Sequence, residues 1–433
     1  MTLPKIRPGY AWYVVILLAL LSIVSYADRL ILAILVDPVK QELAVSDTQM
    51  GLLLGLSFAS VYATLALILA QVADRHNRRN LIIIGVLIWS VMTSCSAFAD
   101  NFWQLALCRL GVGVGEAALG PAALSMIADL FNREKRHTPV SVFLAAGTVG
   151  GATAYLIGGA AVAAVSQMSG MDIPLIGEMS PWRLVFLGMG VPGILLGILM
   201  LFSVKEPVRI SGDDMVSEVE ASVIDVVAHL RSARGLYAPI FLGLLFVQMM
   251  VYAIATWFAS VFIRQYGLSI TDTGYAFGFV ALIFGTSGAI FGPYLVSRLE
   301  RANISHAIFR IAALAVAISV PGAIFAPIAP SLSLSIGALC VAMFGLSAGS
   351  ALPALLPQLI APNAVRARVT ALYFFIANIV GLGLTPVLIG LLNDLRPFGL
   401  EGVHQSLTFL AAIILPLSLS VICFGWCRQA RHF

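Results

Sequence analysis

Long apolar runs separated by short polar loops repeat along the whole chain. Each run carries almost no charge and is long enough to cross a hydrocarbon core of about 30 Å as a helix. The pattern therefore predicts twelve transmembrane helices, with ends defined to within a few residues. The predicted spans are 11–36, 47–73, 80–99, 102–131, 138–166, 182–203, 236–264, 271–297, 306–327, 331–360, 364–393 and 403–427.

The composition supports this pattern. Of the 433 residues, 60% are hydrophobic and 11% are charged, and the mean hydropathy is +0.98. Soluble domains carry about 25% charged residues, so a water-soluble protein is excluded and an all-α polytopic membrane protein is predicted. The first run, from Ala11 to Val36, is longer than the apolar region of a cleaved signal and lacks a clear small-residue cleavage site. We expect it to remain as a helix.

The charges in the loops predict the orientation. Most of the 25 Lys and Arg fall on the side that carries the N-terminus, whereas Lys40, Arg183, Arg264 and Arg396 fall on the opposite side. Because basic loops stay in the cytoplasm, both termini are expected to be cytoplasmic. The net charge of +4 therefore reflects membrane topology, and no nucleic-acid partner is expected.

The longest polar segment lies midway and separates six spans from six. It predicts an N-terminal six-helix half (1–204), a cytoplasmic linker with a surface helix (205–235) and a C-terminal six-helix half (236–433). The stretch "ADRHNRR" after the second span is echoed by "SRLERAN" after the eighth, which indicates two pseudo-symmetric halves. Such halves are typical of transporters that rock around a site near the middle of the membrane.

Four ionisable residues lie deep within predicted spans: Asp28 and Arg29 in the first, and Arg109 and Glu116 in the fourth. Asp28 lies about 13 Å from the outer end of its span, close to the middle of the bilayer. A charge there costs at least about 2.5 kcal/mol, so such residues usually face a wet cavity or one another. Arg109 and Glu116 share one helix face, and we expect all four to meet in one pocket.

Two interpretations of these charges remain. They form either a buried network that only fixes helix packing, or a coupling site in which the acids exchange protons and the arginines hold an anionic group. The second is favoured, because a buried carboxyl gains or loses a proton near neutral pH when an arginine beside it moves. All six histidines lie in loops or at span ends, so Asp28 and Glu116 are the evident proton carriers.

The second half has no comparable charge, but the runs "VQMMVYAIATWFASVF" and "ALYFFIANIVG" are rich in methionine and aromatic residues. A cavity that is charged on one wall and apolar on the other suits a molecule with an anionic head and an apolar tail. Packing against lipid or protein remains the alternative for each second-half residue. The candidate substrate-binding residues are Tyr26, Arg29, Arg109, Glu116, Gln248, Tyr252, Trp257, Tyr373, Phe374 and Asn378.

Two motifs resemble the major facilitator superfamily. "AQVADRHNRR" is similar to its loop signature between helices 2 and 3, and "CRLGVGVGEA" to its helix 4 signature, in which Arg109 takes the place of the arginine implicated in proton coupling. The resemblance implies the major facilitator fold and a latch on the cytoplasmic side. The residues of this predicted gate are Asp74, Arg75, Arg78, Arg79, Asp129, Arg298 and Arg301.

More narrowly, "YADRL", "VADRHNRR", "GVGEAALGPAALSMIADLF" and "VKEP" resemble the Spinster branch, whose members carry lysophospholipids and sphingoid phosphates. This resemblance implies a monomeric, proton-coupled transporter of amphipathic lipids that works by alternating access in a bacterial inner membrane. It also implies that Asp28, Glu116 and Arg109 are the protonation and coupling residues.

Two other transport functions stay open. One is a proton-coupled symporter of small organic anions such as sugar acids, whose branch also has Asp-Arg in helix 1. The other is a drug/proton antiporter, although "GTVGGATAYLIGG" in helix 5 lacks the Gly-Pro pair of the antiporter motif. An enzyme is not expected, because the sequence has no His-Glu-x-x-His and no Ser-His pair, and neither cofactor nor metal is predicted.

Overall fold

The computed structural model describes residues 7–166, 179–209 and 223–430, and most of these are helical. Twelve helical segments of the described chain are long and apolar enough to cross a membrane, which confirms the predicted number and order of spans. The segments are Pro8–Ile34, Asp47–Arg75, Arg78–Phe98, Phe102–Leu130, His137–Ser166, Pro181–Ser203, Arg234–Tyr266, Ile270–Arg301, Ala307–Ile328, Leu332–Ile360, Val365–Leu395 and Val403–Gln429.

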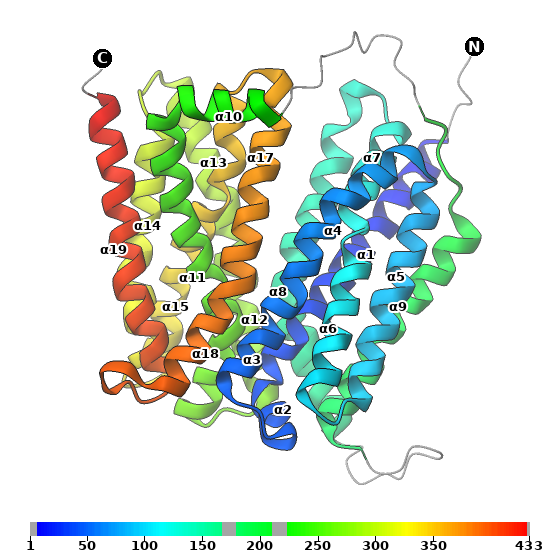
Figure 1. Cartoon of the computed structure of the whole chain (residues 1–433), viewed down its shortest axis with the longest axis vertical. Coiled ribbons are helices and arrows are strands. Elements are labelled where there is room, and N and C mark those ends of the chain that lie inside the picture. Colours follow the sequence, from blue (N-terminus) through cyan, green and yellow to red (C-terminus); the bar gives the residue numbers. More distant parts are fainter. Residues whose placement is uncertain (1–6, 167–178, 210–222, 431–433) are drawn as a thin grey trace. The chain divides into compact units, whose positions relative to one another are not determined.

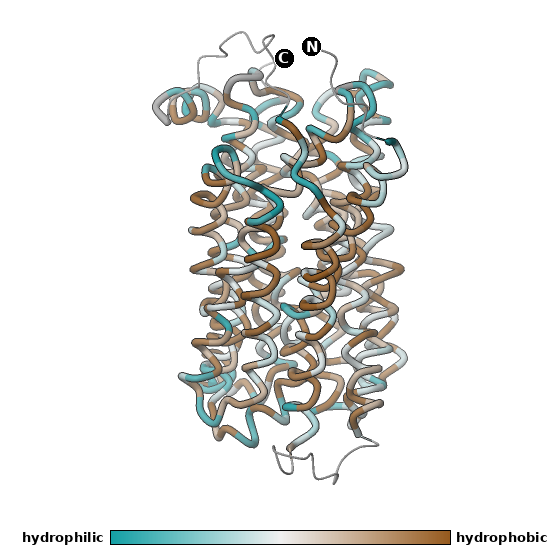
Figure 2. The backbone as a smooth tube through the Cα atoms, turned by 90° about the vertical axis from the view of Figure 1, so that its right-hand side faces the viewer, coloured by the Kyte–Doolittle hydropathy of each residue, from teal (hydrophilic) through white to brown (hydrophobic). Residues whose placement is uncertain are grey.

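Hydrophobic residues predominate along the helices, and hydrophilic residues gather near the helix ends (Figure 2). This distribution is the one that a bilayer requires, because backbone polar groups are satisfied within each helix and apolar side chains face the acyl chains. The all-α polytopic class predicted from the sequence is therefore confirmed for the described residues.

The chain divides into two compact units. Unit 1 comprises Met1–Val45, Leu52–Ser211 and Ser269–Gly278. In it α1 packs along α8, and α5 packs against both α6 and α9 (Figure 1). Its helices are α1 (Pro8–Ile34), α2 (Val36–Leu43), α4 (Leu56–Arg75), α5 (Arg78–Cys95), α6 (Phe102–Glu116), α7 (Leu119–Leu130), α8 (His137–Ser166) and α9 (Pro181–Ser203).

Unit 2 comprises Ser46–Gly51, Gly212–Leu268 and Phe279–Phe433. The short α10 (Val223–Ser232) lies across the ends of α11 and α17 (Figure 1), whereas residues 210–222 of the predicted linker lie outside the described residues. The other helices of unit 2 are α11 (Arg234–Tyr266), α13 (Thr286–Arg301), α14 (Ala307–Phe325), α15 (Leu332–Ser350), α16 (Leu355–Ile360), α17 (Asn363–Ala377), α18 (Thr385–Leu395) and α19 (Val403–Ala430).

Each unit also includes a short segment from the other half of the sequence. Ser46–Gly51, the start of α3 (Asp47–Leu54), belongs to unit 2, and Ser269–Gly278, most of α12 (Ile270–Val280), belongs to unit 1. In unit 1 the rings of Tyr155 and Phe277 meet edge to face with centroids 4.5 Å apart. The sequence pattern gives no sign of either exchange, because both depend on tertiary contacts.

Close glycine packing positions the helix that carries two of the membrane charges. A Cβ added at Gly85 of α5 would lie 2.6 Å from the carbonyl oxygen of Gly115 on α6. A Cβ at Gly115 would collide with the backbone of Gly85 and Trp89. Small residues allow such an approach between helices in lipid, and here they bring α6 close to α5 beside Glu116.

Candidate functional site

Helices α1 and α6 bring two of the four membrane charges into direct contact in unit 1. Arg29 donates from Nε and from Nη2 to the same oxygen of Glu116, Oε2, at 3.1 Å and 2.5 Å. The side chain of Arg29 is 7% exposed and that of Glu116 is fully buried. The second oxygen of Glu116 has no hydrogen-bond partner among the described residues. One lone carboxylate oxygen is therefore left beside the pair.

Three aromatic rings surround the Arg29 guanidinium. Its central carbon lies 4.8 Å from the ring centroid of Tyr26, 4.6 Å from that of Phe58 and 4.7 Å from that of Tyr62. Cations are attracted to the faces of such rings. The three rings therefore stabilise the charged Arg29 guanidinium by cation–π contacts, and Glu116 is the one carboxylate of the described chain that pairs with it.

Arg109 is also buried, but it binds backbone rather than a carboxylate. Its Nη1 donates to the carbonyl of Asp28 at 3.2 Å and its Nη2 to the carbonyl of Arg29 at 3.0 Å. These two bonds fix α6 against the C-terminal third of α1. Since carbonyl oxygens carry no formal charge, they solvate the guanidinium without neutralising it.

The carboxyl of Asp28 is fully buried and forms no ion pair among the described residues. The polar side chains that face it are those of Trp89 and Thr93, two donors on α5. An ionised carboxylate is costly in such a place, whereas a protonated one is tolerated. The expected pocket of four charges thus contains a single ion pair, Arg29 with Glu116.

The ion pair borders a cavity of about 200 Å³ in unit 1. Ser22, Ser25 and the rings of Tyr26 and Tyr62 contribute to its wall, together with Arg29 and Glu116 themselves. The cavity therefore offers a cation, hydroxyl groups and aromatic surface to a ligand. An anionic group that entered it would compete with Glu116 for Arg29.

The second-half candidates occupy different environments in unit 2. Trp257 is fully buried and donates from Nε1 to the carbonyl of Pro386 at 3.0 Å. Tyr373 is 4% exposed and packs on Phe241 with ring centroids 4.7 Å apart, while the neighbouring Phe374 is 39% exposed. Trp257 and Tyr373 thus serve packing in this conformation.

The remaining candidates of the second half gather at an irregular turn. Asn378 begins a π-helical segment, Asn378–Leu384, between α17 and α18. A Cβ added at Gly381 would lie 3.0 Å from the Tyr252 ring and 3.2 Å from the Gln248 side chain. Gln248 and Tyr252 of α11 therefore pack against this segment. Irregular helical turns of this kind often occur at functional sites.

The predicted gate residues separate into two sets. Arg78 is 2% exposed, and its guanidinium binds Asp129 of α7, the Ser125 hydroxyl and, at 2.7 Å, Glu206. The backbone amide of Arg79 donates to the other oxygen of Glu206 at 2.8 Å. Sequence reasoning missed the role of Glu206, although this residue lies in the stretch "VKEP", because only these contacts reveal it. We call Arg78, Asp129 and Glu206 the Arg78 cluster.

The other gate residues are exposed. The side chains of Asp74 and Arg75 at the end of α4, and of Arg298 and Arg301 at the end of α13, make no hydrogen bond or ion pair within the described part of the chain. The structure therefore brings Arg78, Arg79 and Asp129 together and leaves these four at the surface of their own units.

The sequence analysis did not select Asp47, a buried acid in the segment Ser46–Gly51, which comes from the first half of the sequence but belongs to unit 2. Asp47, 1% exposed, accepts bonds from Arg264 of α11 at 3.1 Å and 3.2 Å and from Asn393 of α18. Asp394 in turn accepts from the amides of Asp47 and Thr48 at 3.2 Å and 2.7 Å, which caps the start of α3. We call these four residues, Asp47, Arg264, Asn393 and Asp394, the Asp47 cluster. Its members are too far apart in sequence for any local pattern to reveal it.

No group of three or more His, Cys, Asp or Glu placed to hold a metal ion occurs in the residues that the structure describes.

A comparison with protein families matches residues 18–386 to the model described as Major Facilitator Superfamily. Three curated relatives are similar to the chain. An "MFS-type efflux pump" of Mycolicibacterium smegmatis is 27% identical over 98% of this chain and 94% of its own length. A "Probable L-galactonate transporter" of Escherichia coli is 27% identical over 67% of this chain and 62% of its own length. Human "Protein spinster homolog 1" is 33% identical over 47% of this chain and 36% of its own length.

Among solved structures, a bacterial homolog of the human lysosomal transporter Spinster, in an inward-facing and occupied conformation, is similar to the chain. It superposes with a TM-score of 0.82 over 99% of this chain and 98% of its own, at 24% identity. At 24% identity, this similarity establishes the fold alone.

Proposed function

The chain belongs to the major facilitator superfamily of transporters, and on that premise we propose that it is a secondary active, proton-coupled transporter of amphipathic, lipid-like molecules with an anionic head. Lysophospholipids and sphingoid phosphates are the chemical types that we propose. Transport proceeds by alternating access, in which protonation shifts the populations of the inward-open and outward-open states.

The observation that carries this proposal is the fully buried carboxyl of Asp28, which forms no ion pair among the described residues, in the residue next to the Arg29 of the Arg29–Glu116 ion pair. With Asp28 protonated, the two arginines and Glu116 leave the site with a net charge of +1, and loss of the proton brings that charge to zero. Binding of a proton and binding of an anionic head therefore favour each other. By linkage the coupling is reciprocal, so the anion also increases the affinity for the proton.

Aromatic surface supports an amphipathic substrate. Tyr26 and Tyr62 flank the guanidinium that would hold the head, and their rings offer apolar surface beside it. Human Protein spinster homolog 1, 33% identical over 47% of this chain, supports the resemblance to the Spinster branch, and this substrate class comes from that resemblance.

A second candidate is a proton-coupled symporter of small organic anions. The cavity of about 200 Å³ is small, and the hydroxyls of Ser22 and Ser25 on its wall suit a compact polar anion. The relative described as a probable L-galactonate transporter supports this reading, whereas the relative described as an efflux pump supports a drug/proton antiporter.

We propose further that two clusters act as latches for alternating access. The Arg78 cluster ties α5 to α7 and to the segment after α9, and we assign it to the cytoplasmic side, where both termini of a monomer in the bacterial inner membrane would lie. The Asp47 cluster binds residues of the second span to α11 and α18. In this proposal the cluster holds the start of α3 to the other helices of unit 2, and its release would free that segment.

Uptake into proteoliposomes under an imposed pH gradient tests the proposal. We expect labelled lysophospholipid to accumulate and a labelled sugar acid or a cationic drug to stay at background. Asp28→Asn, Glu116→Gln and Arg109→Ala are each expected to abolish the response to the pH gradient, while Asp225→Asn on the surface helix α10 keeps it. Unchanged proton dependence in all three site variants would rule out the coupling assignment.

A further inference from the structure

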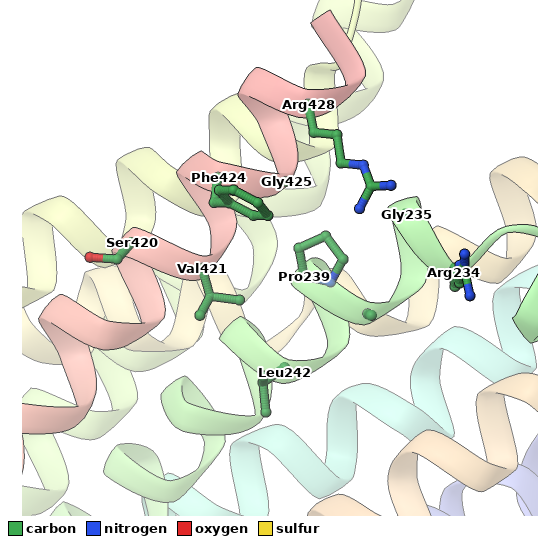
Figure 3. A pocket seen from close by; sticks show the side chains of 10 residues that line it. Arg234, Gly235, Pro239, Leu242, Ser420, Val421, Phe424, Gly425 and Arg428 are labelled. Carbon is green, nitrogen blue, oxygen red and sulfur yellow. The ribbon is translucent and has the colours of Figure 1, made fainter. Parts of the chain in front are cut away.

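A groove that is distinct from the unit 1 cavity lies between α11 and α19, where α11 begins and α19 ends (Figure 3). It lies wholly within unit 2 and has a volume of about 490 Å³. Its floor is apolar. The floor residues are Ala238, Pro239 and Leu242 of α11 and Val421 and Phe424 of α19.

The floor is open to the surroundings of the protein. Phe424 is 70% exposed and Leu242 is 46% exposed, although both lie in membrane-spanning helices. Close packing shapes the groove, because a Cβ added at Gly425 would collide with the ring of Pro239. An apolar side chain that is exposed on a spanning helix faces the acyl chains of the lipid. The floor of this groove is therefore suited to contact a hydrocarbon chain that lies along the protein surface.

Two arginines form the rim. Arg234 is the first residue of α11, and Arg428 lies in the last turn of α19. Figure 3 shows the Arg428 guanidinium reaching toward the first turn of α11 near Gly235. Both arginines are exposed, and neither guanidinium has a hydrogen bond or ion pair with the protein in the described ranges. The groove has no acidic residue in its lining.

The spacing of charge and floor matches the dimensions of a phospholipid. Leu242 follows Arg234 by eight residues, so the floor extends about 12 Å from the rim toward the middle of the membrane. The rim therefore lies at the level of the head groups and the floor at the level of the upper acyl chain. A free anion would use only the rim and would leave the apolar floor without a role.

We propose that this groove binds an anionic phospholipid, with its phosphate between the guanidiniums of Arg234 and Arg428 and an acyl chain along Pro239, Leu242 and Phe424. Guanidinium groups bind phosphate through paired hydrogen bonds. Basic pockets between helix ends also attract anionic head groups. A zwitterionic lipid is disfavoured, because the lining offers no carboxylate to its ammonium group. The site does not depend on the identity of the transported molecule.

Native mass spectrometry of the whole chain in detergent micelles tests the proposal, with dioleoylphosphatidylglycerol as the probe and dioleoylphosphatidylcholine as the neutral lipid. We expect a saturable phosphatidylglycerol adduct and at least about tenfold weaker phosphatidylcholine binding. Each of Arg234→Gln and Arg428→Gln is expected to weaken phosphatidylglycerol binding about fivefold. Arg231→Gln on α10, an exposed arginine near the same helix ends but outside the groove, is the matched control and keeps full affinity.

Two further arms of the experiment distinguish a bound lipid from a bound inorganic anion. Phe424→Ala keeps both charges and shortens the floor, so weaker phosphatidylglycerol binding in this variant supports a bound acyl chain. Inorganic phosphate is expected not to displace the lipid. The proposal is overturned by unchanged affinity in the Arg234→Gln/Arg428→Gln double variant, by equal binding of both lipids, or by full displacement with inorganic phosphate. Thermal unfolding of each variant confirms that the fold is intact, and the transport assay is scored separately.

Discussion

Arg29 donates two hydrogen bonds to one carboxylate oxygen of Glu116, although the residues are 87 positions apart and lie on different helices. The other oxygen of Glu116 has no hydrogen-bond partner among the described residues, and the buried carboxyl of Asp28 forms no ion pair there. The four charges therefore make one strong contact and leave one buried acid free to change its protonation state.

Replacing Glu116 by alanine is expected to destabilise the protein by about 3 kcal/mol or more, because the Arg29 guanidinium would remain buried without its counter-ion. The free energy of unfolding in mixed detergent micelles measures the effect. The double variant Arg29→Met/Glu116→Leu removes both charges and is expected to regain much of the loss. Equal free energies of unfolding for the Glu116→Ala variant and the wild type would show that the Arg29–Glu116 pair does not stabilise the fold.

Replacing Asp28 by asparagine is expected to change the free energy of unfolding by less than about 1 kcal/mol, because asparagine keeps the shape of the side chain and an oxygen that can accept from Trp89 or Thr93. Counterflow exchange of substrate, which needs no net proton movement, should persist in this variant. Accumulation driven by a pH gradient should be lost. Loss of both activities to the same degree would mean that Asp28 binds substrate or supports the fold rather than carrying the proton.

Replacing Arg78 by lysine is expected to lower the stability of unit 1 by about 2 kcal/mol, since a single ammonium cannot replace the bonds to Asp129, Glu206 and Ser125. Arg75→Lys is the matched control, because Arg75 is exposed and makes no bond within the described chain. Thermal unfolding of both variants checks the prediction. Equal unfolding midpoints would show that the Arg78 cluster adds nothing to stability.

Replacing Asp47 by asparagine, or Asp394 by asparagine, is expected to loosen the start of α3. Asp394 holds the amides of Asp47 and Thr48, and Asp47 holds Arg264. Hydrogen–deuterium exchange of residues 46–54 should accelerate about tenfold in each variant, which corresponds to about 1.4 kcal/mol. Asp272→Asn, at an exposed acid of α12, should leave that peptide unchanged. Unaltered exchange in both cluster variants would remove the proposed latch.

The pH dependence of stability is expected to include a contribution from Glu42, which lies outside the membrane spans. Partial burial raises the pKa of Glu42, but the hydrogen bonds from Trp182 and Arg183 outweigh it and hold that pKa below its usual value. A lowered folded-state pKa adds stability above the unfolded value of about 4.3, which is lost as the pH falls through the folded value. Below about pH 4.3, the unfolding temperature of Glu42→Gln should fall less steeply than that of the wild type. Parallel curves would contradict this, and Glu401→Gln at an exposed loop is the control.

The unit 1 site was partly predictable. Asp28, Arg29, Arg109 and Glu116 stood out because an ionisable residue in a long apolar run is a local feature, visible without any contact. Their pairing was not predictable. Arg109 binds two carbonyl groups of α1 rather than an acid, since helix rotation and the close approach of Gly85 to Gly115 decide which side chain reaches which.

The twelve spans and the all-α class were determined by the sequence alone, because a bilayer imposes the same length and apolarity on every crossing whatever its neighbours are. Only the tertiary structure decided the ion pair of Arg29 with Glu116, the role of Glu206, and the Asp47 cluster. Each of these needs atoms from distant parts of the chain within hydrogen-bond distance of one another. Periodicity specifies the face of a helix and not the partner that the face meets.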